Sequence, residues 1–153
     1  MNIIKTKIDG LVKLKPLIIK DKRGSFTESY NRSVINKLLG KKNFVQDNES
    51  ESKRGVLRGL HFQKPPHAQS KLVRCVYGIV LDIAVDVRKH SKTYGNFVST
   101  ILSGENKEQL FIPRGFAHGF LVLSESAIIS YKVDNYYNFE SESGIIWNDL
   151  DLN

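Results

Sequence analysis

Short runs of β-branched and aromatic residues, separated by polar turns, recur along most of the chain. Such runs are typical of β-strands, and turns rich in Gly and Pro are typical of the connections between strands. The turns include Lys22-Arg23-Gly24, Pro65-Pro66, Ser103-Gly104 and Pro113-Arg114-Gly115. The pattern predicts strands at residues 11–19 (interrupted by Pro16), 25–30, 55–63, 71–88, 96–102, 109–112, 119–123, 127–133 and 144–147.

One segment has helical spacing instead, with apolar side chains at positions 34, 35, 38 and 39. Ser33 is the expected N-cap of this helix, and Gly40 is the residue expected to end it. Many closely spaced strands with one short helix predict an all-β fold, built as a jelly-roll barrel or β-sandwich. No repeat, low-complexity segment or linker interrupts the sequence, so we expect residues 1–153 to form a single domain.

The charge balance favours anionic partners, because 23 Lys and Arg residues outweigh 16 Asp and Glu residues and give a net charge of +7. Nucleic acid, phosphorylated metabolites and acidic membrane surfaces all fit that charge. Cys75 is the only cysteine of the sequence, which excludes an intramolecular disulfide and a cysteine-rich zinc site. The sequence contains neither a signal-peptide pattern nor an apolar run long enough to span a membrane. We therefore expect a soluble, cytoplasmic protein without a membrane partner.

Two spaced motifs bear on metal binding. The first runs from Gly55 through His61 and Gln63 to Lys71, and the second is Pro113-x-Gly115-x-x-His118. Both resemble the motifs of the cupin jelly roll, in which the first motif of metal-binding members supplies a second histidine and a glutamate. Gln63 and Lys71 stand at those two positions, and an amide is a poor substitute for imidazole while an ammonium repels a cation. We expect no metal site.

The titratable residues left in such a barrel suit proton transfer. A single histidine is more often structural than catalytic, but His61, Lys71, His118 and Tyr131, with Asp82 on a neighbouring strand, combine a base, a cation and a phenol. Beside a carbonyl, the base would take a proton, the cation would stabilise the enolate and the phenol would return a proton.

A more specific resemblance covers nearly the whole chain. It is carried, in order, by the segments at residues 21–30, 44–48, 56–63, 71–74, 82–86, 105–110, 112–120 and 147–149. In these segments the sequence resembles the dTDP-4-dehydrorhamnose 3,5-epimerase family of cupin-fold enzymes. The resemblance implies an isomerase without a cofactor, which inverts C3 and C5 of dTDP-4-keto-6-deoxy-D-glucose through an enolate. The product would be dTDP-4-keto-L-rhamnose, in the biosynthesis of dTDP-L-rhamnose.

The resemblance also implies a role for each catalytic candidate. His61 would remove the ring protons, Tyr131 would deliver a proton to the opposite face, and Lys71 would stabilise the enolate oxygen. His118 and Asp82 would form a supporting pair, in which the carboxylate sets the imidazole tautomer.

Binding residues follow from the same resemblance. Arg23 and Arg58 would hold the diphosphate, and the nucleotide and sugar site would be lined by Phe26, Glu28, Gln46, Asn48 and Tyr137. In the family the N-terminal segment reaches into the partner's site, so we expect a homodimer in which Arg23, Phe26 and Glu28 act in trans. Arg58 and His61 would face opposite sides of a regular strand, and we therefore expect a β-bulge at Gly59.

Alternatives remain open at this point. The family pairs its catalytic histidine with an aspartate beyond the Trp147-Asn148-Asp149 segment, and we expect this sequence to lack that last piece. One alternative is an epimerase of a single centre (C3 or C5) or a ketoisomerase on a related dTDP-4-keto sugar. Gln63 disfavours the ketoisomerase, because those enzymes place a second histidine there. A second alternative is a catalytically silent cupin that binds a nucleotide sugar. Nucleic-acid binding is not expected, because only the net charge supports it.

Overall fold

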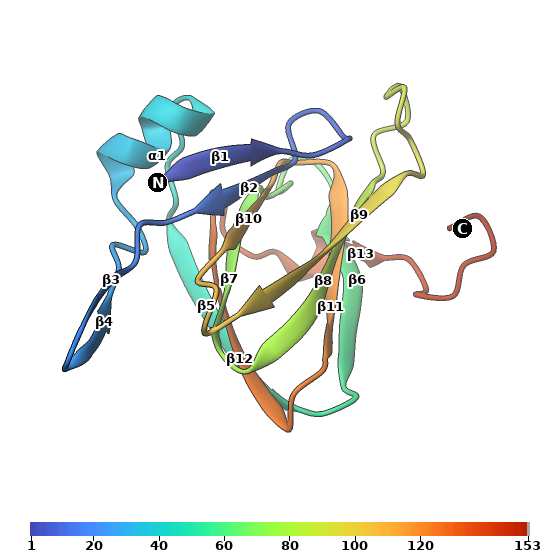
Figure 1. The fold of residues 1–153 in the computed structure, drawn as a ribbon. Helices are drawn as coiled ribbons and strands as arrows, with labels where there is room; N and C mark the ends of the chain where they lie inside the picture. The colour runs from blue at the N-terminus through green and yellow to red at the C-terminus, as the bar shows by residue number, and fades with distance from the viewer. Residues whose placement is uncertain (153) are drawn as a thin grey trace.

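Two antiparallel sheets face each other in the computed structural model, which describes residues 1–152 (Figure 1). The six-stranded sheet has the order β1-β2-β10-β7-β12-β5. Its strands are β1 (Asn2–Lys5), β2 (Val12–Lys15), β10 (Gln109–Ile112), β7 (Lys71–Tyr77), β12 (Ser126–Val133) and β5 (Gln46–Lys53). The five-stranded sheet has the order β13-β6-β11-β8-β9. Its strands are β13 (Glu142–Gly144), β6 (Leu57–Gln63), β11 (Phe116–Val122), β8 (Ile79–Asp86) and β9 (Phe97–Ser103).

The main core lies between the two sheets and contains residues of both. Val73, Cys75 and Ile129 come from the six-stranded sheet, and Val80 and Ala84 come from the five-stranded sheet. Because successive side chains of a strand point to opposite faces, Lys71 shares the inner face with Val73, and Asp82 shares it with Ala84. The strand alternation therefore directs polar groups of both sheets toward the same interior.

Helix α1 (Arg32–Leu39) packs on the outer face of the six-stranded sheet, where Ile35 contacts the second core around Leu14, Leu72 and Phe111. The predicted N-cap, Ser33, is wrong. The Asn31 side chain caps the helix, because its oxygen accepts hydrogen bonds from the amides of Ser33 (3.0 Å) and Val34 (3.3 Å). Gly40 ends the helix as predicted. No helix within residues 1–152 is long and apolar enough to cross a membrane.

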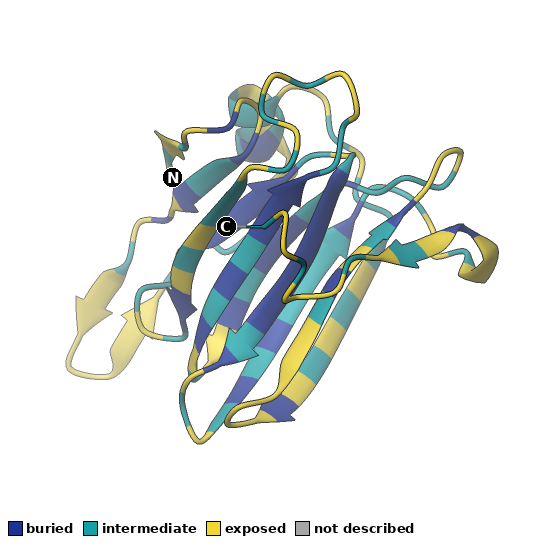
Figure 2. Cartoon of the chain, turned by 90° about the vertical axis from the view of Figure 1, so that its right-hand side faces the viewer, coloured by how far each residue is buried: buried dark blue, intermediate teal, exposed yellow. Residues whose placement is uncertain are grey.

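A hairpin of β3 (Ile19–Asp21) and β4 (Gly24–Phe26) extends away from the sandwich (Figure 1). All residues of both strands are exposed, whereas buried positions gather in the strands of the two sheets (Figure 2). The expected strand at residues 11–19 is in fact divided between β2 and β3, and the one expected at residues 25–30 ends at Phe26.

Three other sequence expectations need correction. The apolar run at residues 71–88 forms two strands, β7 and β8, because Gly78 turns the chain from one sheet to the other with a φ of 77°. Residues 145–147 lie beyond β13 and form no strand. The polar strand β5 was not expected, although it pairs with β12 over its whole length as an edge strand. The prediction of an all-β sandwich with one short α-helix is confirmed for the described residues.

Candidate active site

A polar cavity that is open to solvent lies between the two sheets, and the exposed residues Arg58 and His61 line it. Two neighbouring volumes, of about 340 and 420 Å³, share His61, Lys71 and Tyr131 in their linings. His61 belongs to β6 of the five-stranded sheet, whereas Lys71 on β7 and Tyr131 on β12 belong to the six-stranded sheet. The two opposite walls of the cavity therefore each supply a titratable group.

His118 and Asp82 form a buried pair on adjacent strands. The His118 Nε2 atom lies 3.0 Å and 3.1 Å from the two carboxylate oxygens of Asp82, and the residues are 6% and 0% exposed. A carboxylate that accepts from Nε2 fixes the proton on that nitrogen and the orientation of the ring. His118 also stands directly opposite His61 in the register of β11 and β6, so the pair supports the wall that carries His61.

The Lys71 side chain lines the cavity, and no carboxylate of residues 1–152 lies within ion-pair distance of its ammonium. Burial lowers the pKa of Lys71 from 10.5 to about 8, although the negative charges of Asp82 and Glu142 partly oppose this effect. The Nζ atom is 5.8 Å from the centre of the Tyr131 ring. Within residues 1–152, Lys71 forms no ion pair, since Asp82 is engaged by His118 and Glu142 accepts from Tyr137. A cation in this position is available to a negative charge on a bound molecule.

The Tyr131 phenol keeps its proton at neutral pH. Burial raises the pKa of Tyr131, the positive charge of Arg58 acts in the opposite direction, and Glu142 raises it further. A protonated phenol that lines a cavity opposite a histidine is suited to donating a proton.

A β-bulge brings Arg58 and His61 to the same cavity. The register of β6 with β11 pairs His118 with His61 and Phe120 with Arg58, so that Gly59 and Leu60 stand against Gly119 alone. Gly59 has a φ of 130°, which favours glycine, and a Cβ atom on Gly119 would lie 2.7 Å from the Arg58 carbonyl oxygen. The bulge expected at Gly59 is present. Arg58 consequently lines the larger volume together with His61.

The loop after β12 closes one end of the cavity, and Gln63 holds it in place. The Gln63 Nε2 atom donates to the carbonyl oxygens of His67 (3.1 Å) and Tyr136 (3.3 Å), and its Oε1 atom accepts from the Asn138 amide (2.8 Å). The Tyr137 hydroxyl in this loop donates to Glu142 Oε2 at 2.6 Å, and the carboxylate raises the pKa of Tyr137. The position that would bind a metal in other cupins is therefore a structural tether here. Within residues 1–152, no three His, Cys, Asp or Glu side chains are grouped so that they could hold a metal ion.

Several lining residues follow the sequence prediction and others do not. Gln46 and Asn48 lie on β5 and are joined by a hydrogen bond of 2.9 Å from Gln46 Nε2 to Asn48 Oδ1. Ser50, Gln69 and Glu142 also line the cavity, although no sequence pattern indicated them. Glu142 lies in a stretch of acidic and serine residues that is typical of a solvated surface, so only the pairing of β13 with β6 reveals its place.

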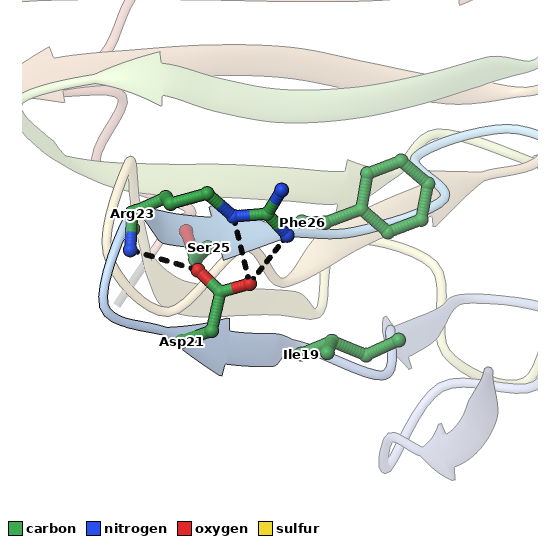
Figure 3. Close-up of a pocket in the computed structure, with 6 residues that line it drawn as sticks. Ile19, Asp21, Arg23, Ser25 and Phe26 are labelled. Atoms are coloured by element: carbon green, nitrogen blue, oxygen red, sulfur yellow. Dashed lines mark hydrogen bonds and ion pairs between the residues drawn. The ribbon is translucent and has the colours of Figure 1, made fainter.

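The three N-terminal candidates lie outside this cavity in the single chain. The Arg23 guanidinium pairs with Asp21 of its own hairpin, since Nη2 and Nε donate to Oδ2 at 2.6 Å and 3.1 Å (Figure 3). The Phe26 side chain on the same hairpin is 68% exposed, and Glu28 accepts a hydrogen bond from Asn31 Nδ2 at 3.2 Å. Arg23, Phe26 and Glu28 are therefore not brought together with His61 within one chain.

Comparisons with known proteins find relatives over nearly the whole chain. A family model described as dTDP-4-dehydrorhamnose 3,5-epimerase matches residues 5–153. The dTDP-4-dehydrorhamnose 3,5-epimerase of Salmonella typhimurium is 55% identical over 97% of this chain and 82% of its own length. A crystal structure of dTDP-6-deoxy-D-glucose-3,5-epimerase from Legionella pneumophila, in complex with dTDP-4-keto-L-rhamnose, is 51% identical and has a TM-score of 0.96 over 99% of this chain and 80% of that chain. A 3'-monoepimerase from Streptomyces bikiniensis, in complex with dTDP-quinovose, is 30% identical, with a TM-score of 0.91 over 96% of this chain and 75% of that chain.

Proposed function

This chain belongs to the dTDP-4-dehydrorhamnose 3,5-epimerase family, and from that premise we propose how its cavity inverts C3 and C5 of dTDP-4-keto-6-deoxy-D-glucose. The enzyme is an isomerase, and the product of the proposed reaction is dTDP-4-keto-L-rhamnose. One observation supports the proposal most strongly. A base on one sheet and a phenol on the other line the same cavity, and inversion requires a proton to leave one face of the sugar and another to arrive at the opposite face.

The reaction begins with proton removal beside the C4 ketone. The carbonyl acidifies the C–H bonds at C3 and C5, and the His61 imidazole takes a proton from each carbon in turn. The electron pair of the broken C–H bond moves into an enolate, whose oxygen the Lys71 ammonium stabilises. Tyr131 then gives its phenolic proton to the other face of the carbon. The imidazolium and the phenolate return to their starting states by exchange with water, and the ketone of the substrate makes a cofactor unnecessary.

Arg58, an exposed residue that lines the cavity, supplies charge for the diphosphate. Its Nε atom donates to Ser52 Oγ at 2.9 Å, which holds the guanidinium without neutralising it. Gln46, Asn48 and Tyr137 lie at the end of the cavity beyond Lys71 and are placed to contact the nucleotide and sugar. The other proposed diphosphate ligand, Arg23, requires a second copy of the chain.

We propose a homodimer in which the β3–β4 hairpin enters the partner's site. The hairpin is fully exposed in one chain and carries Arg23 and Phe26, which have no role at the chain's own cavity. Exposed strands with free backbone edges favour pairing with another chain. A cytoplasmic location is also part of the proposal, and it is compatible with a sequence that has one cysteine and therefore no intramolecular disulfide.

Solvent-deuterium incorporation tests the proposed reaction. With dTDP-4-keto-6-deoxy-D-glucose in D2O, NMR should show deuterium at both C3 and C5. His61→Ala should abolish exchange at both carbons, whereas Tyr131→Phe should keep exchange but lose inversion, because His61 can still remove and return a proton. Tyr77→Phe is the matched control, since Tyr77 is 61% exposed and lies outside the cavity.

The same experiment separates the alternatives. Similarity to the 3'-monoepimerase favours a single-centre epimerase as the second candidate, and this candidate predicts deuterium at C3 alone. A ketoisomerase would move the carbonyl, which the carbon spectrum of the product would reveal. Binding of the nucleotide sugar without any exchange would leave a silent binding protein and refute the proposed reaction.

A further inference from the structure

Lys71 combines burial with access to the cavity. Its side chain lines both cavity volumes, so a bound molecule reaches its Nζ atom, and no carboxylate within the described residues forms an ion pair with it. An unpaired amine in a desolvated site is the environment in which lysines act as nucleophiles toward carbonyl carbons.

Arg58 adds a second requirement for the ligand. Its guanidinium lines the 420 Å³ volume together with Lys71, and among the described residues it bonds only to neutral oxygens, at Ser52 Oγ (2.9 Å) and the Glu51 carbonyl (3.3 Å). A free guanidinium is a strong ligand for phosphate. A molecule with a carbonyl at one end and a phosphate at the other therefore matches both cations.

We propose that Lys71 forms an imine with phosphorylated aldehydes that enter this cavity, with Arg58 holding the phosphate, so that the site is also a site of reversible covalent modification. The neutral Lys71 amine attacks the aldehyde carbon and forms a carbinolamine. Loss of one water molecule, which carries away the aldehyde oxygen, gives the C=N bond. No oxidant or reductant takes part, and hydrolysis restores the lysine.

The environment of Lys71 favours the neutral amine that this step needs. With a pKa of about 8, about a quarter of Lys71 is neutral at pH 7.5, against about a thousandth of an ordinary lysine. The lower basicity also weakens the amine as a nucleophile, which leaves an advantage of about tenfold or more over exposed lysines. The titratable and charged groups that face Lys71 across the cavity are His61, Arg58, Asp82, His118, Tyr131 and Glu142.

Reductive trapping tests this inference. The full-length protein is incubated with pyridoxal 5′-phosphate at pH 7.5, reduced with sodium borohydride and digested for mass spectrometry. The Lys71 peptide should be labelled at least tenfold faster than the peptide of Lys53, an exposed lysine. Lys71→Arg should lose this label, and Arg58→Gln should slow it to the rate seen with pyridoxal, which has no phosphate.

Two measurements on the wild-type protein keep the test independent of folding defects. One is protection by inorganic pyrophosphate, and the other is the comparison of pyridoxal with pyridoxal 5′-phosphate. Inorganic pyrophosphate should protect Lys71, because it competes for Arg58, and should leave labelling of Lys53 unchanged. Equal labelling of Lys71 and Lys53, or equal rates with pyridoxal and its phosphate, would overturn the inference. The imine needs only the cavity and its two cations, so its failure and the failure of the proposed epimerase reaction are separate results.

Discussion

Lys71 shows how a single residue sets stability against function. Its side chain is half-buried between the sheets, no ion pair reaches it among residues 1–152, and desolvation lowers its pKa from 10.5 to about 8. The folded protein therefore bears the cost of the charged form at neutral pH, whereas the unfolded chain exposes the same ammonium to water. An apolar side chain at this position should therefore stabilise the fold, and the chemical role proposed for Lys71 accounts for a charge here.

Replacing Lys71 with methionine should stabilise the protein and inactivate it. At pH 7 the gain should be at most about 3 kcal/mol, the free energy that corresponds to the lowering of the pKa. Because the folded pKa lies below the unfolded one, the wild type gains stability as pH rises from about 8 to 10.5, and the advantage of the variant should disappear over that range. Urea denaturation at several pH values measures both effects.

Lys53→Met is the matched control, since Lys53 is exposed. It removes the same charge and should change the free energy of unfolding by less than about 0.5 kcal/mol at every pH. A Lys71→Met variant that is less stable than wild type at pH 7 would contradict the assignment of Lys71 as an uncompensated charge.

Individual site residues differ in how far the sequence reveals them. Arg58 and His61 could be placed together in advance, because Gly59 between them permits the bulge that their common ligand requires. The tether role of Gln63 could not, because it depends on backbone atoms of residues more than 70 positions further along the chain. Glu142 was missed for the same reason, since its place depends on a pairing between distant segments.

At the scale of secondary structure, the cap of α1 gives a direct comparison of two candidate residues. Asn31→Ala should lower the free energy of unfolding by about 1 kcal/mol, because it removes the acceptor for the amides of Ser33 and Val34. Ser33→Ala should change it by less than about 0.5 kcal/mol, since Ser33 lies inside the first turn. Thermal unfolding resolves the difference as about 2–4 °C in Tm, and a larger effect at Ser33 would return the cap to that residue.

The close contact between Gly59 of β6 and Gly119 of β11 allows the bulge that brings Arg58 and His61 to the same cavity. A Cβ atom on Gly119 would lie 2.7 Å from the Arg58 carbonyl oxygen and 3.1 Å from the Gly59 Cα atom. Gly119→Ala should therefore displace the bulge, destabilise the fold by about 1–3 kcal/mol and lower kcat/KM by about 10- to 100-fold. Steady-state kinetics and denaturation on the same samples measure the two effects.

Gly55→Ala separates the kinetic effect from instability. Gly55 has a φ of 79° with no atom within 4 Å of an added Cβ, so the substitution should cost about 1 kcal/mol of backbone strain without moving Arg58. Unchanged kcat/KM in Gly119→Ala would show that the bulge tolerates the methyl group.

Most strands could be predicted because they are rich in β-branched and aromatic residues. The prediction failed where backbone pairing between distant segments, or a turn within a strand-like segment, determines the structure. Strand β5 reads QDNESESK and forms because its backbone pairs with β12, not because its side chains favour a strand. The segment from Lys71 to Asp86 is rich in β-branched residues on both sides of Gly78, so the sequence pattern does not show that the chain passes there from one sheet to the other. The position of the β3–β4 hairpin follows from no local pattern.

For the whole molecule, the proposed exchange of hairpins predicts complementation between inactive variants. Arg23→Ala and His61→Ala should each lose activity alone. If Arg23 acts in trans, unfolding and refolding an equal mixture should restore about a quarter of wild-type activity, since about half of the dimers are mixed and each has one intact site. No recovery, with mixed dimers confirmed by mass spectrometry, would place Arg23 at the site of its own chain.

Because each sheet carries part of the proposed active site, the distance between the sheets should affect the rate of the reaction. That distance is fixed by side chains such as Val73 and Ala84, which pack in the core and touch no substrate. A bulkier residue at Ala84 should push the two sheets apart and so increase the distance between His61 and Tyr131. We therefore expect turnover to depend on the thickness of the core, so that repacking that preserves the fold should still slow the proposed reaction.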